Sequence, residues 1–235
     1  MNLIAIIIIF SIVQSLFGMG LLVFGTPALM LSGFNYSETL SYLLPSSLVI
    51  SISQLYGQKY LFNIHTKRFL LFSIPPLIVT LFIVLNNNLD IEINKALACI
   101  LIFFSLTNAF SVTSKKLKNI VSNYPIPILA IMGSVHGLTN LGGSVLSLYS
   151  SCQFEEKRAM RSFIAYCYLV FCTVQIIILI ANGAFVYRVE ALYFPLIAFF
   201  IYITLGRYGF NSTSNVLFLN LFNAFMFMFG VALLM

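Results

Sequence analysis

The chain has 235 residues, of which 60% are apolar and 8% carry a charge, and its mean hydropathy is +1.02. Soluble domains carry roughly 25% charged residues, so a chain with so few cannot cover a water-facing surface. This composition excludes a soluble enzyme, a nucleic-acid-binding protein and a disordered chain, and it makes the lipid bilayer the expected solvent. The net charge of +6 indicates orientation in the membrane rather than a polyanionic partner.

Charged residues divide the chain into eight apolar runs. In order, the runs free of Asp, Glu, Lys and Arg are 1–37, 39–58, 69–89, 96–114, 119–154, 162–187, 191–206 and 208–235. A membrane-crossing helix needs about 20 apolar residues. Six runs therefore predict one crossing each, whereas the first and the fifth are too long for one crossing and too short for two.

The two long runs carry helix breakers in their middle. These are Gly18, Gly20, Gly25 and Pro27 in the first run, and Gly137, Asn140, Gly142 and Gly143 in the fifth. Each glycine disfavours a helix by about 1 kcal/mol relative to alanine. We therefore predict two helical hairpins that enter the bilayer, break near its midplane and leave on the same side, with the second half-helices starting near Leu21 and Ser144. Broken backbone at that depth must be surrounded by protein or by a polar cavity.

The chain also repeats itself. Gly18-Met-Gly20 matches Asn140-Leu-Gly142 at a spacing of 122 residues, and Glu38 matches Glu156 at a spacing of 118. The order of these features predicts a single membrane domain, 1–235, made of two homologous halves, 1–114 and 119–235, that a short basic linker, 115–118, joins.

The distribution of basic residues separates two topologies. If all eight runs cross, seven basic residues lie on one side of the membrane and five on the other; if runs one and five are re-entrant, the numbers become ten and two. The positive-inside rule favours the second arrangement, which places both termini outside the cytoplasm. Each half then has one re-entrant broken-helix hairpin plus three transmembrane helices, so the halves are inverted relative to each other, as in many secondary transporters.

At the breaks the sequence resembles a known family. Gly18-Met-Gly20-Leu-Leu-Val-Phe-Gly-Thr-Pro27 is similar to the GxGGGxLLxP opening of the TauE/SafE family of sulfite exporters and small-anion permeases, and the second half offers Gly137-Leu-Thr-Asn140-Leu-Gly142-Gly143-Ser144. A Thr-Ser pair of the family corresponds to Ser46-Ser47. The sequence departs from the pattern at Leu21, Leu22, Asn140 and Ser144, where the family has glycine, and at Ile164-Ala165 in the second half.

The resemblance implies a permease of the bacterial inner membrane that moves a small anion, such as a sulfur oxyanion or an organosulfonate. A helix that restarts inside the bilayer exposes free N–H groups and a partial charge of about +0.5, which suits an anion. The expected substrate-binding residues combine close backbone approach with polar donors: Gly18, Gly20, Ser46, Ser47, Asn140, Gly142, Gly143 and Ser144. Alternatively, the glycines only allow tight helix packing.

His136 is the one ionisable side chain inside a long run, which makes it a candidate to carry a coupled proton; the alternative is a neutral histidine that lines the bundle. We expect no enzyme activity, cofactor or metal, because motifs such as HExxH, GxSxG and CxxC are absent. Two further alternatives are a transporter of a different small solute and a non-transporting membrane scaffold, whose centre large side chains such as Leu21 and Leu22 would fill.

Overall fold

The computed structural model describes residues 3–57, 63–87, 99, 119–154, 156–212 and 231, and this part of the chain is helical, with no strand. Its elements are α1 (Leu3–Phe17), α2 (Leu21–Leu31), α3 (Tyr36–Leu55), α4 (Ile64–Asn87), α7 (Pro125–Thr139), α8 (Gly142–Gln153), α9 (Lys157–Ala181), the 3-10 turn η1 (Val189–Leu192), α10 (Tyr193–Ile201), the π-helical turn η2 (Tyr202–Gly206) and α11 (Arg207–Ser212). The all-α prediction is confirmed for these residues. The linker 115–118 and most of the runs 96–114 and 208–235 lie outside them.

The first long run is interrupted at Gly18 and Gly20, as predicted, whereas the other two expected breakers, Gly25 and Pro27, lie inside α2. α1 ends at Phe17, and α2 begins at Leu21 as expected. Between them, Gly18 has a φ of 83° and Gly20 a φ of 146°. Side chains with a Cβ rarely adopt this backbone, so glycine is what allows the chain to leave one helix and start the next within three residues.

The second long run breaks by a different device. α7 ends at Thr139, and the next residue, Asn140, adopts the left-handed conformation with a φ of 64°. Asparagine tolerates this conformation better than most residues, which explains how it replaces the glycine of the family pattern. α8 then begins at Gly142, two residues before the expected start at Ser144.

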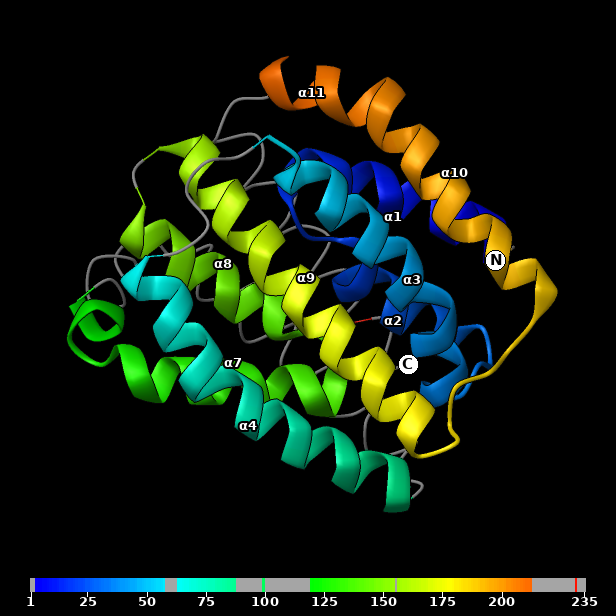
Figure 1. Ribbon diagram of the computed structural model, residues 1–235, viewed down its shortest axis with the longest axis horizontal. Helices are drawn as coiled ribbons and strands as arrows, with labels where there is room; N and C mark the ends of the chain where they lie inside the picture. The colour runs from blue at the N-terminus through cyan, green and yellow to red at the C-terminus, as the bar shows by residue number, and fades with distance from the viewer. Residues whose placement is uncertain are drawn as a thin grey trace.

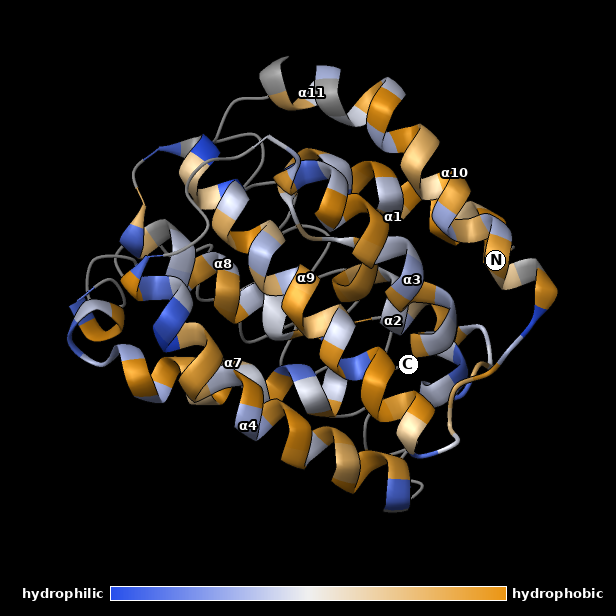
Figure 2. Cartoon of the chain, viewed as in Figure 1, coloured by the Kyte–Doolittle hydropathy of each residue, from blue (hydrophilic) through white to orange (hydrophobic). Residues whose placement is uncertain are grey.

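The distribution of apolar side chains matches a protein that lipid surrounds. Every residue of α2 from Leu21 to Met30 is buried, so this short helix lies in the core. The outer helices α4 and α10 instead expose large apolar side chains, including Leu71 at 66% and Phe200 at 65%. Both helices are mostly hydrophobic along their length (Figure 2). In water such surfaces would promote aggregation, whereas in a bilayer they are the expected covering.

Two of the described helices are long and apolar enough to cross a bilayer, over Ile64–Asn86 and Arg158–Ala181. They correspond to α4 and α9. The run 39–58 forms α3, a helix of 20 residues whose polar side chains are mostly buried. The run 191–206 forms the shorter apolar helix that α10 and η2 make together, Tyr193–Gly206.

The helix α9 organises the bundle. In Figure 1 it runs through the middle of the view, with α4 and α7 on one side and α1, α3 and α10 on the other. It packs against α3, α4 and α8, while α2 contacts α8, an element far from it in the sequence. Both helix breaks therefore lie in the interior, next to α9.

Two glycines let α7 and α4 approach closely. A Cβ on Gly133 would overlap the Ser73 carbonyl oxygen, and one on Gly137 would overlap Thr80 Oγ1 and lie 2.5 Å from the Leu77 carbonyl oxygen. The Ser73 hydroxyl also donates to the Leu129 carbonyl oxygen at 2.8 Å. This is the small-residue packing that membrane helices use, because dispersion contacts replace the hydrophobic effect as the main attraction.

This contact predicts a specific loss of stability. Gly133→Leu should lower the free energy of unfolding by at least about 1–3 kcal/mol, because rigid backbone of α4 occupies the space that the new side chain needs. The measurement is thermal unfolding in detergent, followed by circular dichroism. Ile131→Phe adds bulk to the exposed side of the same helix and should be nearly neutral. Equal stability of both variants would show that the α4–α7 contact is looser than described.

Candidate functional site

The starts of α2 and α8 are two helix N-termini inside the protein. Leu21 and Leu141 are fully buried, and neither helix has a side-chain cap for its first N–H groups. Uncapped N–H groups, together with the partial positive charge of the helix dipole, favour an anion. In a bilayer interior this attraction is barely screened by water, so the two helix ends are the strongest candidate for a ligand site.

A hydrogen bond joins the two broken segments. Asn140 Nδ2 donates to Thr26 Oγ1 in α2 at 2.9 Å, and both side chains are fully buried. Close by, a Cβ on Gly143 would lie 2.6 Å from Val23 Cγ2. The first turn of α8 therefore rests on α2, and residues 114 positions apart in the sequence share one interface.

Polar and aromatic side chains surround the start of α8. The His136 ring stacks on Phe171 with 4.0 Å between the ring centroids, and the ring of Tyr168 lies at 5.9 Å. Gln175 lies beside His136 and donates from Nε2 to Asn140 Oδ1 at 3.4 Å. All of these side chains are fully buried. Among the described residues the Tyr168 hydroxyl has no hydrogen-bond partner, and the His136 ring nitrogens and Gln175 Oε1 have none besides each other.

The first break has a different environment. Gln14, in the last turn of α1, donates from Nε2 to Ser47 Oγ at 2.9 Å and to Ser51 Oγ at 3.3 Å, and it accepts from Ser47 Oγ at 3.0 Å. Gln54 Nε2 donates to the carbonyl oxygens of Gln14 at 2.8 Å and of Ser15 at 3.2 Å. These bonds tie the end of α1 to α3 and use up the polar groups of Gln14.

The expected site residues divide between these two regions. Ser47 belongs to the first, where it also contacts Cys172 of α9. Ser46 is buried, and its hydroxyl has no partner among the described residues. Asn140, Gly142 and Gly143 form the second region with His136, whereas the Ser144 hydroxyl donates back to the Leu141 carbonyl oxygen at 2.7 Å.

Gly18 and Gly20 pack against different partners. A Cβ on Gly18 would lie 3.2 Å from Ile164 Cγ2 and 3.3 Å from the Arg161 carbonyl oxygen, both in α9. A Cβ on Gly20 would lie 2.6 Å from Val13 Cγ1 in α1. Substitution at either glycine would therefore disturb the packing as well as any ligand. The Arg161 guanidinium itself stacks 3.9 Å above the Phe210 ring of α11.

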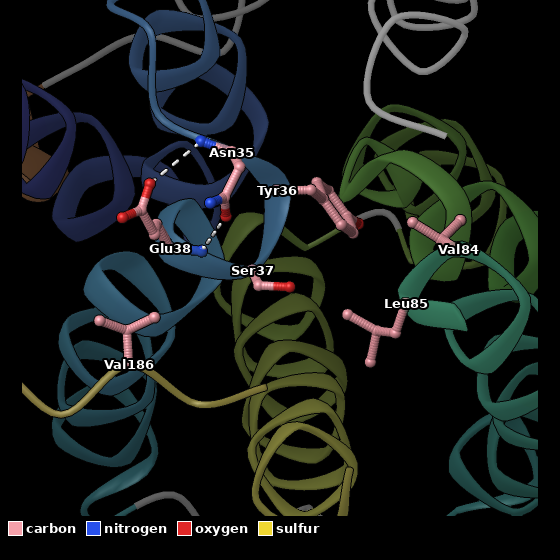
Figure 3. Close-up of a pocket in the computed structure, with 7 residues that line it drawn as sticks. All are labelled: Asn35, Tyr36, Ser37, Glu38, Val84, Leu85 and Val186. Atoms are coloured by element: carbon pink, nitrogen blue, oxygen red, sulfur yellow. Dashed lines mark hydrogen bonds between the residues drawn. The ribbon is translucent and has the colours of Figure 1, made fainter. Parts of the chain in front are cut away.

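A pocket of about 240 Å³ opens at one end of the bundle, between the start of α3, the end of α4 and Val186 (Figure 3). Asn35 and Glu38 cap α3 reciprocally, since each side chain accepts from the other's backbone N–H. Arg188 lies 3.8 Å from Glu38 at the same end. From the pocket wall, the Tyr36 hydroxyl donates to the Gly137 carbonyl oxygen at 3.3 Å, close to the second break.

Three residues of the second region were missing from the sequence-based set: Thr26, Tyr168 and Gln175. Each is a polar side chain inside an uncharged run. The run 162–187 has two amide side chains, and Gln175 is the one that lies within the helix α9 rather than at its end. That signal is weak by itself. What selects these residues is that α2 and α9 pack against the start of α8, which the sequence does not reveal.

Comparison with known proteins identifies the family. Residues 3–233 match the family model described as sulfite exporter TauE/SafE, which is essentially the whole chain. No curated protein and no solved structure matches the chain. The chain belongs to the TauE/SafE family, and it is therefore a membrane protein of an anion-transporter family.

Proposed function

We propose that this TauE/SafE protein is a secondary transporter of the bacterial cytoplasmic membrane, which moves a small anion through a central site between its two broken helices. The observation that carries the proposal is the pair of buried, uncapped helix starts at Leu21 and Gly142, which the Asn140–Thr26 hydrogen bond links. The candidate site residues are those expected from the sequence, and they divide between the two breaks: Gly18, Gly20, Ser46, Ser47, Asn140, Gly142, Gly143 and Ser144. The family description favours a sulfur oxyanion, with sulfite as the first candidate.

The helix contacts support two halves related by a two-fold exchange. In the second half, α7 and α9 pack against α4 of the first half. In the first half, α1 and α3 pack against α10 of the second. Since α4 follows α1–α3 just as α10 follows α7–α9, each half contributes the same element to the other. Inverted repeats would produce this pattern, and such repeats place the substrate at their interface.

The contacts at the two ends of the bundle support the re-entrant topology. The ion pair between Glu38 and Arg188 requires these residues to lie on the same side of the membrane. At the opposite end, His65 packs on Phe154 with 5.2 Å between the ring centroids, and its Nδ1 lies 3.4 Å from the Tyr149 hydroxyl. A topology with eight crossings would separate both pairs across the bilayer, whereas two re-entrant hairpins keep each pair together.

The alternative of a non-transporting scaffold also has an observation behind it. Leu21 and Leu22 replace glycines of the family pattern, and both are fully buried near the first break. In that case the fold would persist without transport. Transport assays on reconstituted protein, with labelled sulfite, sulfate and small organosulfonates, separate the two functions.

The first functional prediction concerns Asn140. Asn140→Gly preserves the left-handed backbone but removes the amide that reaches Thr26 and Gln175. Sulfite transport in proteoliposomes should fall roughly 10-fold or more, because a buried hydrogen bond to a charged group contributes about 1.5–3 kcal/mol.

The matched control for this variant is Asn182→Gly, which removes the corresponding C-cap amide at the exposed end of α9. Its transport rate should stay within about a factor of two of the wild-type rate, since surface changes of this kind have small effects. Full transport by the Asn140→Gly protein would show that the anion pathway does not use the second break.

The second prediction concerns topology. In a chain whose four cysteines are replaced by alanine, cysteines at the exposed positions Ser32 and Asn182 should react with a membrane-impermeant maleimide added to intact cells. Cysteines at the exposed positions Tyr56 and Glu156 should react only after the membrane is opened. The reason is that re-entrant hairpins place the first pair outside and the second pair in the cytoplasm. Labelling of Ser32→Cys and Glu156→Cys from the same side would rule out this topology.

The third prediction concerns proton coupling, for which we propose His136 as the carrier. Its ring faces Tyr168, Phe171 and Gln175 of α9, and no carboxylate among the described residues contacts it. His136→Gln should therefore remove the dependence of transport on pH between about 5 and 8, where imidazole normally titrates. Initial rates at fixed substrate concentration provide the measurement. An unchanged pH profile in this variant would assign His136 a structural role.

A further inference from the structure

The two breaks differ in where their unpartnered polar groups lie. At the first break, the Gln14 amide is fully engaged by Ser47 and Ser51. Ser15 Oγ and Gln54 Oε1 have no partner among the described residues, and Ser15 lies against Gly206 of η2. At the second break, His136 occupies the position that matches Gln14 at the spacing of 122 residues, yet the neighbouring Gln175 side chain is the only partner its ring nitrogens have within the described chain. The Tyr168 hydroxyl has no partner there and Gln175 Oε1 has none besides His136, although all three side chains are completely buried.

These unbonded groups converge on the first turn of α8. A Cβ on Gly142 would lie 3.0 Å from His136 Nδ1, and one on Gly143 would overlap the Tyr168 hydroxyl oxygen. Gln175 lies beside His136 and contacts Asn140, just before the same turn. Three polar side chains from α7 and α9 therefore surround one uncapped helix N-terminus.

Such an arrangement destabilises the empty protein. A buried polar group without a hydrogen bond costs free energy, and the cost is greatest where the surroundings are apolar. Replacing Tyr168 by phenylalanine would remove the free-energy cost of burying an unbonded hydroxyl, and it would change the shape of the side chain little. Buried polar groups that lower the stability of the protein, but that all face one helix N-terminus, are what a ligand-binding site is expected to contain.

We infer that the transported anion is bound on one side only, at the start of α8, with Tyr168 and Gln175 as substrate-contacting residues beside His136, while the first break has a structural role. The inference rests on the proposed transport function and specifies its site. In it, the N–H groups of α8 and the Tyr168 hydroxyl donate to the anion, and Gln175 Oε1 accepts from it.

This set of donors and acceptors selects the charge of the substrate. Neither α7 nor α8 contains a lysine or an arginine, and those of α9 lie in its first two turns, at Lys157, Arg158 and Arg161. The site therefore offers the partial charge of a helix end rather than a full positive charge. A monoanion that retains a proton, such as hydrogensulfite, satisfies Gln175 Oε1, whereas a dianion such as sulfate places a charged oxygen against it.

The test compares binding and stability in the same variants. Tyr168→Phe and Gln175→Leu are purified in detergent, equilibrium binding of labelled sulfite is measured by scintillation proximity, and unfolding of the empty protein is followed by circular dichroism. Both variants should bind sulfite roughly 10- to 100-fold more weakly than the wild type, which corresponds to the loss of a hydrogen bond to a charged group. The melting temperature of Tyr168→Phe should be unchanged or higher.

Ser51→Ala is the matched control, because it also removes a buried hydroxyl, but one that Gln14 already engages at the first break. It should lower the melting temperature and leave sulfite affinity within about a factor of two, since the lost hydrogen bond holds the fold rather than the ligand. Unlabelled sulfate should compete with sulfite poorly in the wild type. Sulfate that competes as well as sulfite would overturn the selection of a monoanion.

The outcomes separate this inference from the proposed function. If the wild type transports sulfite and Tyr168→Phe and Gln175→Leu bind it with unchanged affinity, the one-sided site is wrong and the transporter remains. If Ser51→Ala loses affinity as strongly as Tyr168→Phe, both breaks hold the anion and the inference is also wrong. If the wild type neither binds nor transports any anion tested, the proposed function itself is overturned.

Discussion

Backbone that leaves a helix in the buried interior of a membrane protein must find its hydrogen bonds within the protein, because water is excluded there. This constraint applies at both breaks and accounts for much of the architecture around them. α2 is short and buried on all sides, α9 runs beside both breaks, and the Asn140 side chain connects α8 to Thr26 of α2. The outer helices, by contrast, carry apolar side chains outward, since their backbone is satisfied within each helix. The bundle is thus a shell of ordinary helices around two interrupted ones.

The two breaks meet the constraint with different chemistry. In the first, glycines at positive φ make the turn and the Gln14 amide is bonded to α3. In the second, asparagine makes the turn and leaves His136, Tyr168 and Gln175 facing the start of α8.

Much of the fold could be predicted from sequence, for local reasons. Glycine and asparagine at the breaks are conformational requirements of single residues, so α2 begins where the sequence placed its start. Gly137, which was expected to break the second run, lies inside α7 instead. The start of α8 differed by two residues, because Gly142 and Gly143 enter the helix rather than precede it. Their role is close packing, against His136 and against Tyr168 and Val23 respectively. Glycine is ambiguous in sequence between turning a chain and allowing contact, and only neighbouring helices decide between the two.

The sequence by itself determined the solvent, the helical class, the two interrupted runs and the family, since these depend on composition and on short motifs. Tertiary structure alone decided which polar side chains meet at the breaks. Ser47 and Asn140 were equivalent candidates in sequence, yet one is bonded to Gln14 and the other to Thr26 and Gln175, beside the start of α8. Tyr168 and Gln175 could hardly be identified from the sequence, because a polar residue in an apolar helix belongs to a site only if its side of the helix faces that site. Which side of α9 faces the start of α8 is decided by how α9 packs against helices that are distant in sequence.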